Sequence, residues 1–307
     1  METVIVTGGA GFIGSHTVDL LVNNGYRVVI IDNLSNGRKA NIHPAACFYN
    51  MDICDPQLCE IFQKESVDYV IHLAAQIHVN RSVLDPVLDS KINIEGTLRI
   101  LEQCRQHSVK KIIFSSSGGA IYGETDQIPT RESCRPSPVS PYAIAKLSAE
   151  YYLRYYFETH KLPFVALRYA NVYGPRQDLK GEGGVVAIFI EKMLKKEKIM
   201  ITGDGKQTRD FVFVADVASA NLAALQSDAT GLYNIGSGIE TDILTLYSLL
   251  KELIGFDGDL SFGTLPQAEI RRSCLDSSLA LDTLSFKTSI DLQDGLYETI
   301  SWWNSYM

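Results

Sequence analysis

A glycine-rich turn directly after the first predicted strand constrains the fold of this chain more than any other feature. The turn TGGAGFIG (Thr7–Gly14) follows the β-rich run TVIVT (Thr3–Thr7) and opens a segment with helical apolar spacing. The spacing of Gly8, Gly11 and Gly14 permits a tight turn, a close approach of the backbone to a diphosphate, and close packing of the helix on the strand. The helix N-terminus, with its unpaired N–H groups and positive dipole end, faces those phosphates. The pattern predicts the first βα unit of a doubly wound sheet that binds a dinucleotide.

An acidic residue at the end of the second predicted strand discriminates between two dinucleotides. Asp32 ends the run RVVIID (Arg27–Asp32), 18 residues after Gly14. A carboxylate there accepts hydrogen bonds from a ribose 2′-hydroxyl and repels a 2′-phosphate, so the pattern favours NAD over NADP. The alternative is a glycine-rich turn in which Asp32 only caps a loop, but the strand and the helix that the dinucleotide motif requires are both predicted here.

Two residues after the third predicted strand have two interpretations. Asp52 and Ile53 follow this strand, where they would line an adenine pocket. They are equally typical of an ordinary surface acid and a core isoleucine. Both interpretations stay open on the sequence.

Short β-rich runs alternate with helical segments through the first half of the chain. Further strands are predicted at 69–74, 111–116 and 164–169, with helices at about 93–107 and after Ser140. Strands that alternate with helices indicate a parallel sheet with helices on both faces. The predicted fold class is therefore α/β, with a Rossmann-type doubly wound parallel sheet.

The alternation ends after NVYGPR (Asn171–Arg176). Glycine and charge accumulate in 177–184, and a mixed series of helices and strands follows. We expect residues 1–170 to form the dinucleotide-binding domain and residues 171–307 a smaller, mixed α/β substrate domain, partly interleaved with the first. Open α/β sheets bind ligands at the carboxyl ends of their strands, which places the site under this second domain. The final helix, near 291–303, is expected to pack back on the first half.

Composition excludes several classes of partner and site. The 307 residues carry a net charge of −8, which argues against an electrostatic grip on nucleic acid or on an anionic membrane. No apolar run reaches the length of a membrane span, and the glycine motif begins too early to leave room for a signal peptide. The six cysteines form no CxxC pair and the six histidines no HExxH motif. We therefore expect free thiols, a cytoplasmic protein and no metal site.

The segment SPYAIAK (Ser140–Lys146) places a tyrosine four residues before a lysine at a predicted helix start. Ser140 suits the N-cap, and Pro141 suits the first helical position. Tyr142 and Lys146 then lie on one face, one turn apart. Alone, this spacing is typical of an ordinary amphipathic helix. Beside a bound nicotinamide, however, the two nearby cations are expected to lower the pKa of the Tyr142 phenol from ~10 by ~2–3 units and make it a general base.

A serine run lies at the same carboxyl edge of the predicted sheet. SSSGG (Ser115–Gly119) ends the strand predicted at 111–116. A hydroxyl at this edge would hydrogen-bond the reacting hydroxyl group of a substrate. Serine after a strand is also ordinary turn chemistry, so the run alone does not decide between the two.

The motifs together resemble those of one protein family. Over nearly its whole length the chain carries, in order, TGGAGFIGSH, DNLSNGR, HLAA, FSSSGGAIYGE, SPYAIAK, LRYANVYGPRQ and RDFVFVADVA. It resembles the extended short-chain dehydrogenases/reductases and, within them, the UDP-hexose 4-epimerases. The resemblance implies an isomerase that holds NAD and interconverts UDP-galactose and UDP-glucose through a 4-keto sugar.

The resemblance also assigns roles to individual positions. Tyr142 takes the proton from the 4-hydroxyl and Ser117 assists it, although an extra residue before Tyr122 leaves Ser116 as a rival. Lys146 supports Tyr142 and hydrogen-bonds the cofactor ribose. Expected NAD contacts are Gly8, Gly11, Phe12, Ile13, Gly14, Asp32, Asn33, Leu34, Ser35, Asn36, Gly37, Asp52, Ile53, Leu73, Ala74, Ala75, Gln76, Asn93, Ser115, Ser116, Tyr142, Lys146, Tyr169 and Val172. Expected substrate contacts are Ser117, Tyr142, Asn171, Gly184, Val185, Arg209, Arg271 or its neighbour Arg272, and Ser273.

Three positions bear on the reaction and the substrate. Related dehydratases and decarboxylases carry an acid directly after the catalytic Ser or Thr, whereas Gly118 and Gly119 follow here, which favours epimerisation. Ile77 stands where some epimerases have a lysine. Ser273 matches a position beside the sugar 2-substituent, where a small residue leaves room for an N-acetyl group. UDP-N-acetylhexosamines are therefore expected as further substrates, the alternative being that Ser273 is a plain strand residue.

Two other functions stay open. A different nucleotide-sugar enzyme, such as a UDP-glucuronate 4-epimerase or a reductase, is one of them. A carboxylate substrate would need an additional cation near the sugar, and the sequence does not place one. A non-catalytic NAD-binding sensor is the other, but such proteins often lack the Tyr or the Lys of the active pair, and both are present here.

The resemblance and one helix both indicate a homodimer. Family members commonly pair through helices that match 93–107 and 142–160 and form a four-helix bundle. The second of these contains YYLRYYF (Tyr151–Phe157), which is too aromatic for one buried face. Exposed aromatic side chains of this kind are typical of interfaces.

Overall fold

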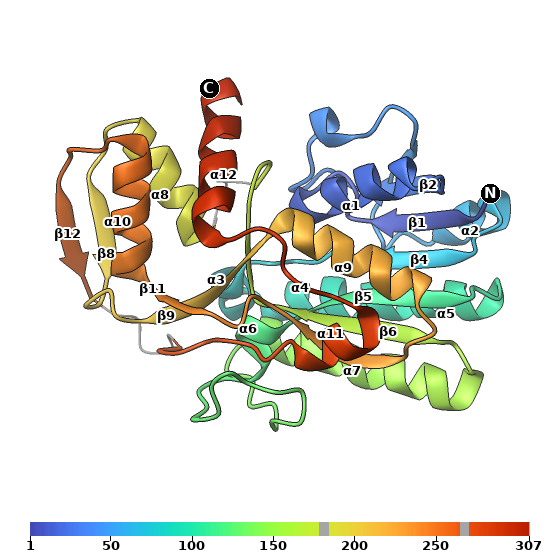
Figure 1. Ribbon diagram of the computed structural model, residues 1–307. Coiled ribbons are helices and arrows are strands. Elements are labelled where there is room, and N and C mark those ends of the chain that lie inside the picture. Colours follow the sequence, from blue (N-terminus) through green and yellow to red (C-terminus); the bar gives the residue numbers. More distant parts are fainter. Residues whose placement is uncertain (178–183, 265–269, 307) are drawn as a thin grey trace.

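One parallel sheet forms the centre of the protein, of which the computed structural model describes residues 1–177, 184–264 and 270–306. Among these residues, seven strands join the sheet, and every neighbouring pair runs parallel (Figure 1). In spatial order they are β10 (Gly231–Ile235), β6 (Phe164–Tyr169), β5 (Lys111–Ser117), β4 (Tyr69–His72), β1 (Thr3–Thr7), β2 (Arg27–Asp32) and β3 (Cys47–Asn50).

The strands are short apolar runs that are buried on both sides. All five residues of β1 are buried, and so are all six of β6. Successive side chains of a strand point to opposite faces, so Val4 and Val6 pack in one core layer and Ile5 packs in the other. Continuous apolar strands are what a parallel sheet needs when helices cover both of its faces.

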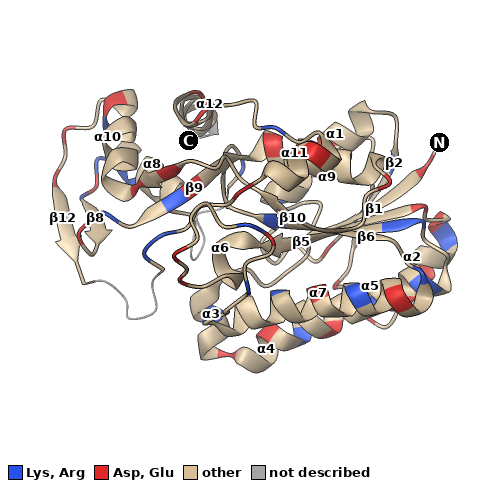
Figure 2. Ribbon diagram, turned by 60° about the horizontal axis from the view of Figure 1, so that its bottom comes forward, with Lys and Arg blue, Asp and Glu red and all other residues tan. Residues whose placement is uncertain are grey.

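Helices cover both faces, which confirms the predicted doubly wound α/β fold. One core layer contains side chains of α1 (Phe12–Asn23), α9 (Val214–Gln226) and α11 (Ser278–Leu284). The other contains side chains of α2 (Leu58–Glu65), α5 (Thr97–Gln106) and α7 (Pro141–His160). In Figure 2, α1, α9 and α11 lie on one side of the sheet, and α5 and α7 lie on the other.

The direction of winding changes between β1 and β4. From β1 the chain builds one side of the sheet through β2 and β3, and it then crosses to β4 and builds the other side through β5, β6 and β10. At such a switch point the loops on the two sides diverge and leave a crevice at the carboxyl ends of the strands. The glycine turn after β1 opens into this crevice.

A second core lies beside the carboxyl ends of the main sheet. It is built from α8 (Val185–Leu194), α10 (Ile243–Ile254), α12 (Leu292–Tyr306), and the small sheets β11 (Glu240–Asp242)–β9 (Thr208–Phe213)–β7 (Asn171–Tyr173) and β12 (Leu260–Gly263)–β8 (Ile199–Thr202). The two halves of the chain interweave. Strand β10 and helix α9 both come from the second half, but β10 pairs with β6 of the main sheet and α9 packs on one face of that sheet.

The expected position of the final helix was wrong. Leu296, Ile300 and Trp303 of α12 are buried in the second core, together with side chains of α8 and α10. In Figure 1, α12 stands upright beside α8 rather than along the sheet. Its apolar face matches this second core, which only the tertiary fold brings together.

The segment predicted as one helix at 93–107 begins with a π-helical turn at Lys91–Gly96 and continues as α5. The short helices α3 (Val79–Leu84) and α4 (Pro86–Ser90) precede it. Figure 2 shows α3, α4, α5 and α7 together along one edge of the molecule. A single turn of helix, α6 (Gly118–Ile121), follows β5, and a 3-10 turn occupies Lys39–Asn41. In the described part of the chain, no helix is both long enough and apolar enough to cross a membrane.

Candidate active site

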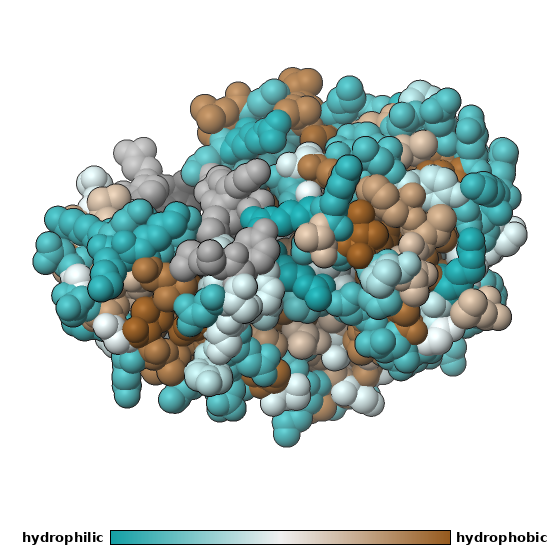
Figure 3. Space-filling model, turned by 90° about the horizontal axis from the view of Figure 1, so that it is seen from above, coloured by the Kyte–Doolittle hydropathy of each residue, from teal (hydrophilic) through white to brown (hydrophobic). Residues whose placement is uncertain are grey.

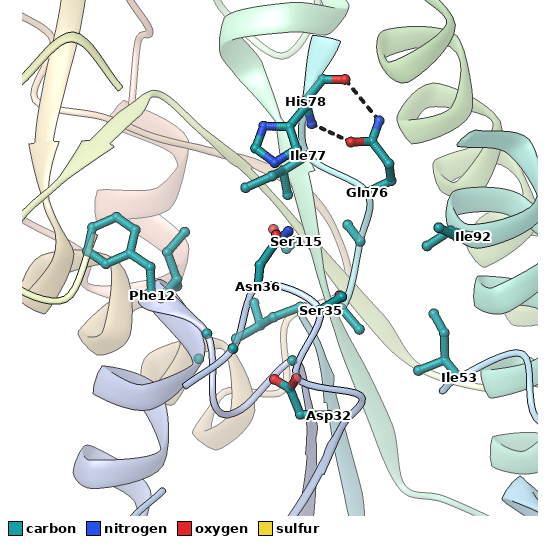
Figure 4. A pocket seen from close by; sticks show the side chains of 18 of the residues that line it. Phe12, Asp32, Ser35, Asn36, Ile53, Gln76, Ile77, His78, Ile92 and Ser115 are labelled. Carbon is teal, nitrogen blue, oxygen red and sulfur yellow. Dashed lines mark hydrogen bonds between the residues drawn. The ribbon is translucent and has the colours of Figure 1, made fainter. Parts of the chain in front are cut away.

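A cavity of about 490 Å³ opens at the switch point, above the carboxyl ends of the central strands. Its wall combines the loops after β1, β2, β3 and β4 with the end of β5 and the start of α7. Figure 4 shows Asp32 at one end of this cavity and His78 at the other, with Ser115 between them. All of the expected NAD contacts line the cavity except Leu34 and Asn93.

The glycine turn leaves space that any larger side chain would fill. Gly8 has a φ of +71°, and a Cβ built on it would lie 2.8 Å from the backbone nitrogen of Ala74. A Cβ on Gly14 would lie 2.0 Å from the carbonyl oxygen of Gly8. Helix α1 is capped at Gly11 without any side-chain hydrogen bond, so its first N–H groups stay available. This backbone cradle fits the diphosphate of a dinucleotide.

Asp32 is held rigidly at the end of β2. Its Oδ2 accepts a hydrogen bond of 3.0 Å from the backbone N–H of Ala10, and its Oδ1 accepts one of 2.8 Å from that of Leu34. A Cβ on Gly37 would lie 2.7 Å from Oδ1, so only glycine leaves the carboxylate room there. Burial raises the pKa of Asp32, and the two backbone donors oppose that shift. The Asp32 carboxylate is thereby fixed on the cavity wall.

Asp52 and Ile53 both lie on the cavity wall. Asp52 Oδ2 accepts a hydrogen bond of 2.7 Å from the Asn33 side chain, which ties the loops after β2 and β3 together. Ile53 is buried, and in Figure 4 it lies on the same side of the cavity as Ile92. The apolar wall that these two isoleucines form suits a flat, uncharged ring.

The start of α7 is built as the sequence predicts. Ser140 Oγ accepts a hydrogen bond of 3.2 Å from the backbone N–H of Ala143, and Pro141 occupies the first turn. Tyr142 and Lys146 both line the cavity. Lys146 Nζ donates a hydrogen bond of 2.8 Å to the carbonyl oxygen of Ser115 and lies 5.9 Å from the centre of the Tyr142 ring.

The expected lowering of the Tyr142 pKa beside a bound nicotinamide stays a prediction. In the protein alone, burial raises the pKa of Tyr142 to about 12, and the neighbouring Ser117 side chain only partly opposes this shift. Burial also lowers the pKa of Lys146 to about 8. The physical reason is that both groups share a desolvated site, and Lys146 Nζ binds the Ser115 carbonyl rather than the phenol.

The two rival serines occupy different surroundings. The Ser117 side chain lies next to that of Tyr142 and influences its pKa. The Ser116 hydroxyl instead donates a hydrogen bond to the Glu150 carboxylate, and Ser116 is buried. Both serines line the cavity, but only Ser117 is a neighbour of the Tyr142 phenol.

Most of the expected substrate residues lie away from the cavity wall. Ser117, Tyr142 and Gly184 line it, and Val185 begins α8 directly after Gly184. The rest surround one edge of the second core. Arg209 and the backbone N–H of Ser273 each donate a hydrogen bond to Thr208 O. Arg272 forms an ion pair with Glu240, and the backbone N–H of Arg271 donates to the Glu124 carboxylate. Asn171 begins β7.

Asn93 acts through a neighbour rather than on the cavity wall. Its side-chain amide pairs with both the N–H and the carbonyl oxygen of Gln76, at 2.9 Å each. Gln76 lines the cavity, and its own amide donates to His78 O and to Asp89 Oδ1. Figure 4 shows the Gln76–His78 pair. Leu34, the other exception, contributes its N–H to Asp32.

Several cavity residues were not predicted from the sequence. They are Ile31, Met51, Ile77, His78, Arg81, Ile92, Ala170 and Gln177. Ile77 and His78 could have been predicted, because they lie in the loop after β4, and this loop leaves the sheet at the switch point beside the cavity. The Arg81 side chain makes no hydrogen bond or ion pair with the described residues. The Oε1 atom of Gln177 is buried without a hydrogen-bond partner among the described residues. No group of metal-ligating side chains is found in the described ranges.

Comparison with known proteins yields one family. Residues 4–236 match the model of the NAD dependent epimerase/dehydratase family. A protein of Methanocaldococcus jannaschii, provisionally named UDP-glucose 4-epimerase, is 48% identical over 97% of both chains. The crystal structure of a UDP-glucose 4-epimerase from Thermotoga maritima with UDP-glucose is 46% identical, with a TM-score of 0.97 over 99% of both chains. That of a UDP-glucose 4-epimerase from Thermus thermophilus with NAD is 38% identical, with a TM-score of 0.95 over 99% of this chain and 100% of the other.

Proposed function

Since the chain belongs to the NAD dependent epimerase/dehydratase family, we propose that it is a UDP-hexose 4-epimerase that interconverts UDP-galactose and UDP-glucose. The observation that carries this proposal is that Tyr142, Ser117 and Lys146 line the same cavity as the glycine cradle and Asp32. A general base, an orienting hydroxyl and a dinucleotide site are thereby combined in one place. The relatives named above support the choice of UDP-hexoses.

Each residue of this group has a separate task. Tyr142 removes the proton of the sugar 4-hydroxyl, and Ser117 hydrogen-bonds the same oxygen and orients it. NAD, when bound, accepts the hydride from carbon 4 and returns it to the opposite face of the 4-keto sugar. Tyr142 then gives its proton back to the new 4-hydroxyl, so the sugar is neither oxidised nor reduced overall. Lys146, a cation one helical turn away, stabilises the phenolate.

The packing after Ser117 supports epimerisation over elimination. A Cβ on Gly118 would lie 2.5 Å from Cδ1 of Leu275, so a side chain at this position has no room. A Cβ on Gly119 would meet only Asn171, at an ordinary 3.6 Å. The position that would carry an acid directly after Ser117 is therefore filled by the second half of the chain. Without an acid there, 4,6-elimination and decarboxylation lack a proton donor.

One observation keeps a second candidate function. Arg81 is an exposed cation on the cavity wall, and a UDP-uronate 4-epimerase needs such a cation for the sugar carboxylate. The two functions are separated by giving the purified protein UDP-galactose and UDP-galacturonate in turn and analysing the products. Conversion of UDP-galactose to UDP-glucose supports the main proposal, and conversion of the uronate alone supports the second. Bound NAD with neither conversion would favour a non-catalytic NAD-binding protein.

Substrate scope is predicted to depend on Ser273. This half-buried residue follows Arg272, and its backbone N–H donates a hydrogen bond to Thr208 O at the start of β9. We expect Ser273→Tyr to reduce kcat/KM for UDP-N-acetylgalactosamine by at least ~10-fold while leaving that for UDP-galactose nearly unchanged, because the ring would fill the space of the N-acetyl group. Steady-state assays on both substrates measure this, and equal losses on the two would contradict it.

We propose a homodimer that pairs through α3, α4 and α7. Exposed apolar side chains gather on these three helices: Val79, Val83, Leu84, Val87, Ile144, Tyr151, Tyr152 and Tyr155. Leu84 is 86% exposed and Val87 76% exposed, which is unusual for side chains of this kind unless they are covered by a partner. The opposite face, seen in Figure 3, carries mostly hydrophilic residues with smaller hydrophobic groups among them.

The free state of all six cysteines supports a cytoplasmic location.

The dimer is tested by changing two tyrosines of this surface. Light scattering of the unchanged protein is expected to give twice the 34.0 kDa of one chain at micromolar concentration. The Tyr151→Arg/Tyr155→Arg variant is expected to give a single chain, because two desolvated cations on each side oppose association. The control is Tyr297→Arg, which changes an equally exposed tyrosine on α12 and should stay dimeric. A monomer at the outset would contradict the proposal.

A further inference from the structure

The end of β5 is joined to α7 by two contacts that belong to the reaction site. The Ser117 side chain lies next to that of Tyr142, and the Ser115 carbonyl oxygen accepts a hydrogen bond of 2.8 Å from Lys146 Nζ. Tyr142 and Lys146 are four residues apart, so they lie on one face of α7. The register between this strand and this helix therefore sets the geometry of the reacting pair.

A third contact continues the same series. Glu150 lies one further turn along the same face of α7, and its Oε1 accepts a hydrogen bond from the hydroxyl of Ser116. Three consecutive residues of β5 are thus tied to positions 142, 146 and 150 of the helix. The second and third contacts both use buried charged groups, since Lys146 is 3% and Glu150 is 4% exposed.

The Glu150 carboxylate is fixed by a fully buried ion pair. Arg168 of β6 donates two hydrogen bonds to it, of 2.9 Å from Nε and 2.6 Å from Nη2. Arg168 Nη1 donates to the Tyr122 hydroxyl at 2.7 Å, and that hydroxyl donates to Asn234 Oδ1 at 2.8 Å. A buried ion pair gives little net stability, because the cost of desolvating both charges offsets their attraction. A contribution to stability alone therefore does not explain this ion pair next to the reaction site.

We propose that Glu150 is a positioning residue for the epimerisation reaction, which holds β5 in register with α7 and keeps Lys146 positively charged. This inference rests on the function proposed above. Glu150 is not among the residues that line the cavity. It acts through Ser116, whose neighbour Ser117 lies next to Tyr142, and through its charge on Lys146. Arg168 binds both oxygens of the carboxylate and thereby fixes Oε1, which also accepts the hydrogen bond from Ser116.

The charges around Lys146 support the second part of the proposal. Burial lowers the pKa of Lys146 to about 8, and the carboxylates of Asp89 on α4 and Glu150 on α7 oppose that shift. On the other sides lie the Phe114 ring, at 4.9 Å, and Tyr142. His72 of β4 is neutral, because burial lowers its pKa to about 3. Removing the charge of Glu150 therefore lowers the pKa of Lys146 further, and the amine loses its proton at a lower pH.

The two parts are tested by two variants and two measurements. Glu150→Gln removes the charge and keeps the shape, whereas Ser116→Ala removes the contact to β5 and keeps the ion pair. The pKa of Lys146 is read from the ¹³Cε signal of labelled lysine in an NMR pH titration, assigned with Lys146→Arg. Steady-state kinetics with UDP-galactose give kcat and KM across the same pH range. Should Glu150→Gln fail to fold because Arg168 is left unpaired, Glu150→Gln/Arg168→Met replaces it.

The expected results differ between the variants. In Glu150→Gln the Lys146 titration is expected to move down by about one pH unit, and the alkaline limb of kcat to move down with it. In Ser116→Ala the titration stays in place, and kcat falls by about 10-fold to 100-fold with little change in KM, because the reacting hydroxyls are misaligned. An unmoved titration in Glu150→Gln, or an unchanged kcat in Ser116→Ala, would overturn the corresponding part. The titration needs no substrate, so it tests Glu150 even if the unchanged protein shows no epimerisation and the proposed function fails.

Discussion

Replacing Tyr142 with phenylalanine is expected to reduce kcat for UDP-galactose by about 10²–10⁴-fold, the contribution of a positioned general base. Only the hydroxyl is lost, and the ring that lines the cavity stays in place. NAD retention and the free energy of unfolding should therefore change little. Steady-state kinetics measure the loss, and the amount of NAD released on denaturation measures retention.

The control for this variant comes from the same helix. Tyr151→Phe removes a hydroxyl from a tyrosine of α7 that is 67% exposed and lies outside the cavity. This variant should keep full activity. Equal kcat values for Tyr142→Phe and the unchanged protein would remove Tyr142 from the reaction and favour a non-catalytic NAD-binding protein.

Gly14→Ala is expected to abolish NAD retention. The added Cβ would lie 2.0 Å from the carbonyl oxygen of Gly8, which is backbone and cannot rotate away as a side chain could. The turn after β1 must shift, at a cost of at least about 1–3 kcal/mol in stability, and its N–H groups then no longer converge on the diphosphate. Thermal unfolding and NAD released on denaturation measure the two effects.

Gly25→Ala provides the matched control, because Gly25 follows the other end of α1. Its φ is +81°, and a Cβ there would meet no atom within 4 Å. This variant should lose roughly 1–2 kcal/mol from backbone strain alone and keep its NAD. Loss of NAD in both variants would show that general destabilisation, and not the cradle, is responsible.

The fold was largely predictable because its signals are local. The short apolar strands and the helices after β1 and before β6 each have a periodicity that can be read within a dozen residues. What could not be predicted was where elements of the second half would pack. The run at β10 looks the same whether it adds an edge strand to the main sheet or belongs to a second domain, and only its pairing with β6 decides this. The face of α12 likewise shows that it is amphipathic, but not which core it covers.

The residues of the candidate site likewise fall into those that local sequence patterns predict and those that only the tertiary fold places. Tyr142, Lys146 and Ser117 were identified because a helix turn and a strand end place them, and the glycine turn carries its own geometry. Gln177 and Arg81 were missed because the first lies in a loop and the second on the short helix α3, and only the tertiary fold brings them to the cavity. The burial of Tyr142, which raises its pKa in the protein alone, could not be predicted from its spacing to Lys146.

The central claim is that one hydride leaves carbon 4 of the sugar and returns to the same carbon without leaving the site. The most direct measurement uses UDP-galactose that carries deuterium at carbon 4, in ordinary water, with the purified protein and no added cofactor. The expected product is UDP-glucose that keeps its deuterium at carbon 4, as mass spectrometry and NMR would show. UDP-glucose with ordinary hydrogen at carbon 4 would contradict the claim, because the hydrogen would then have exchanged with solvent as a proton instead of returning as a hydride.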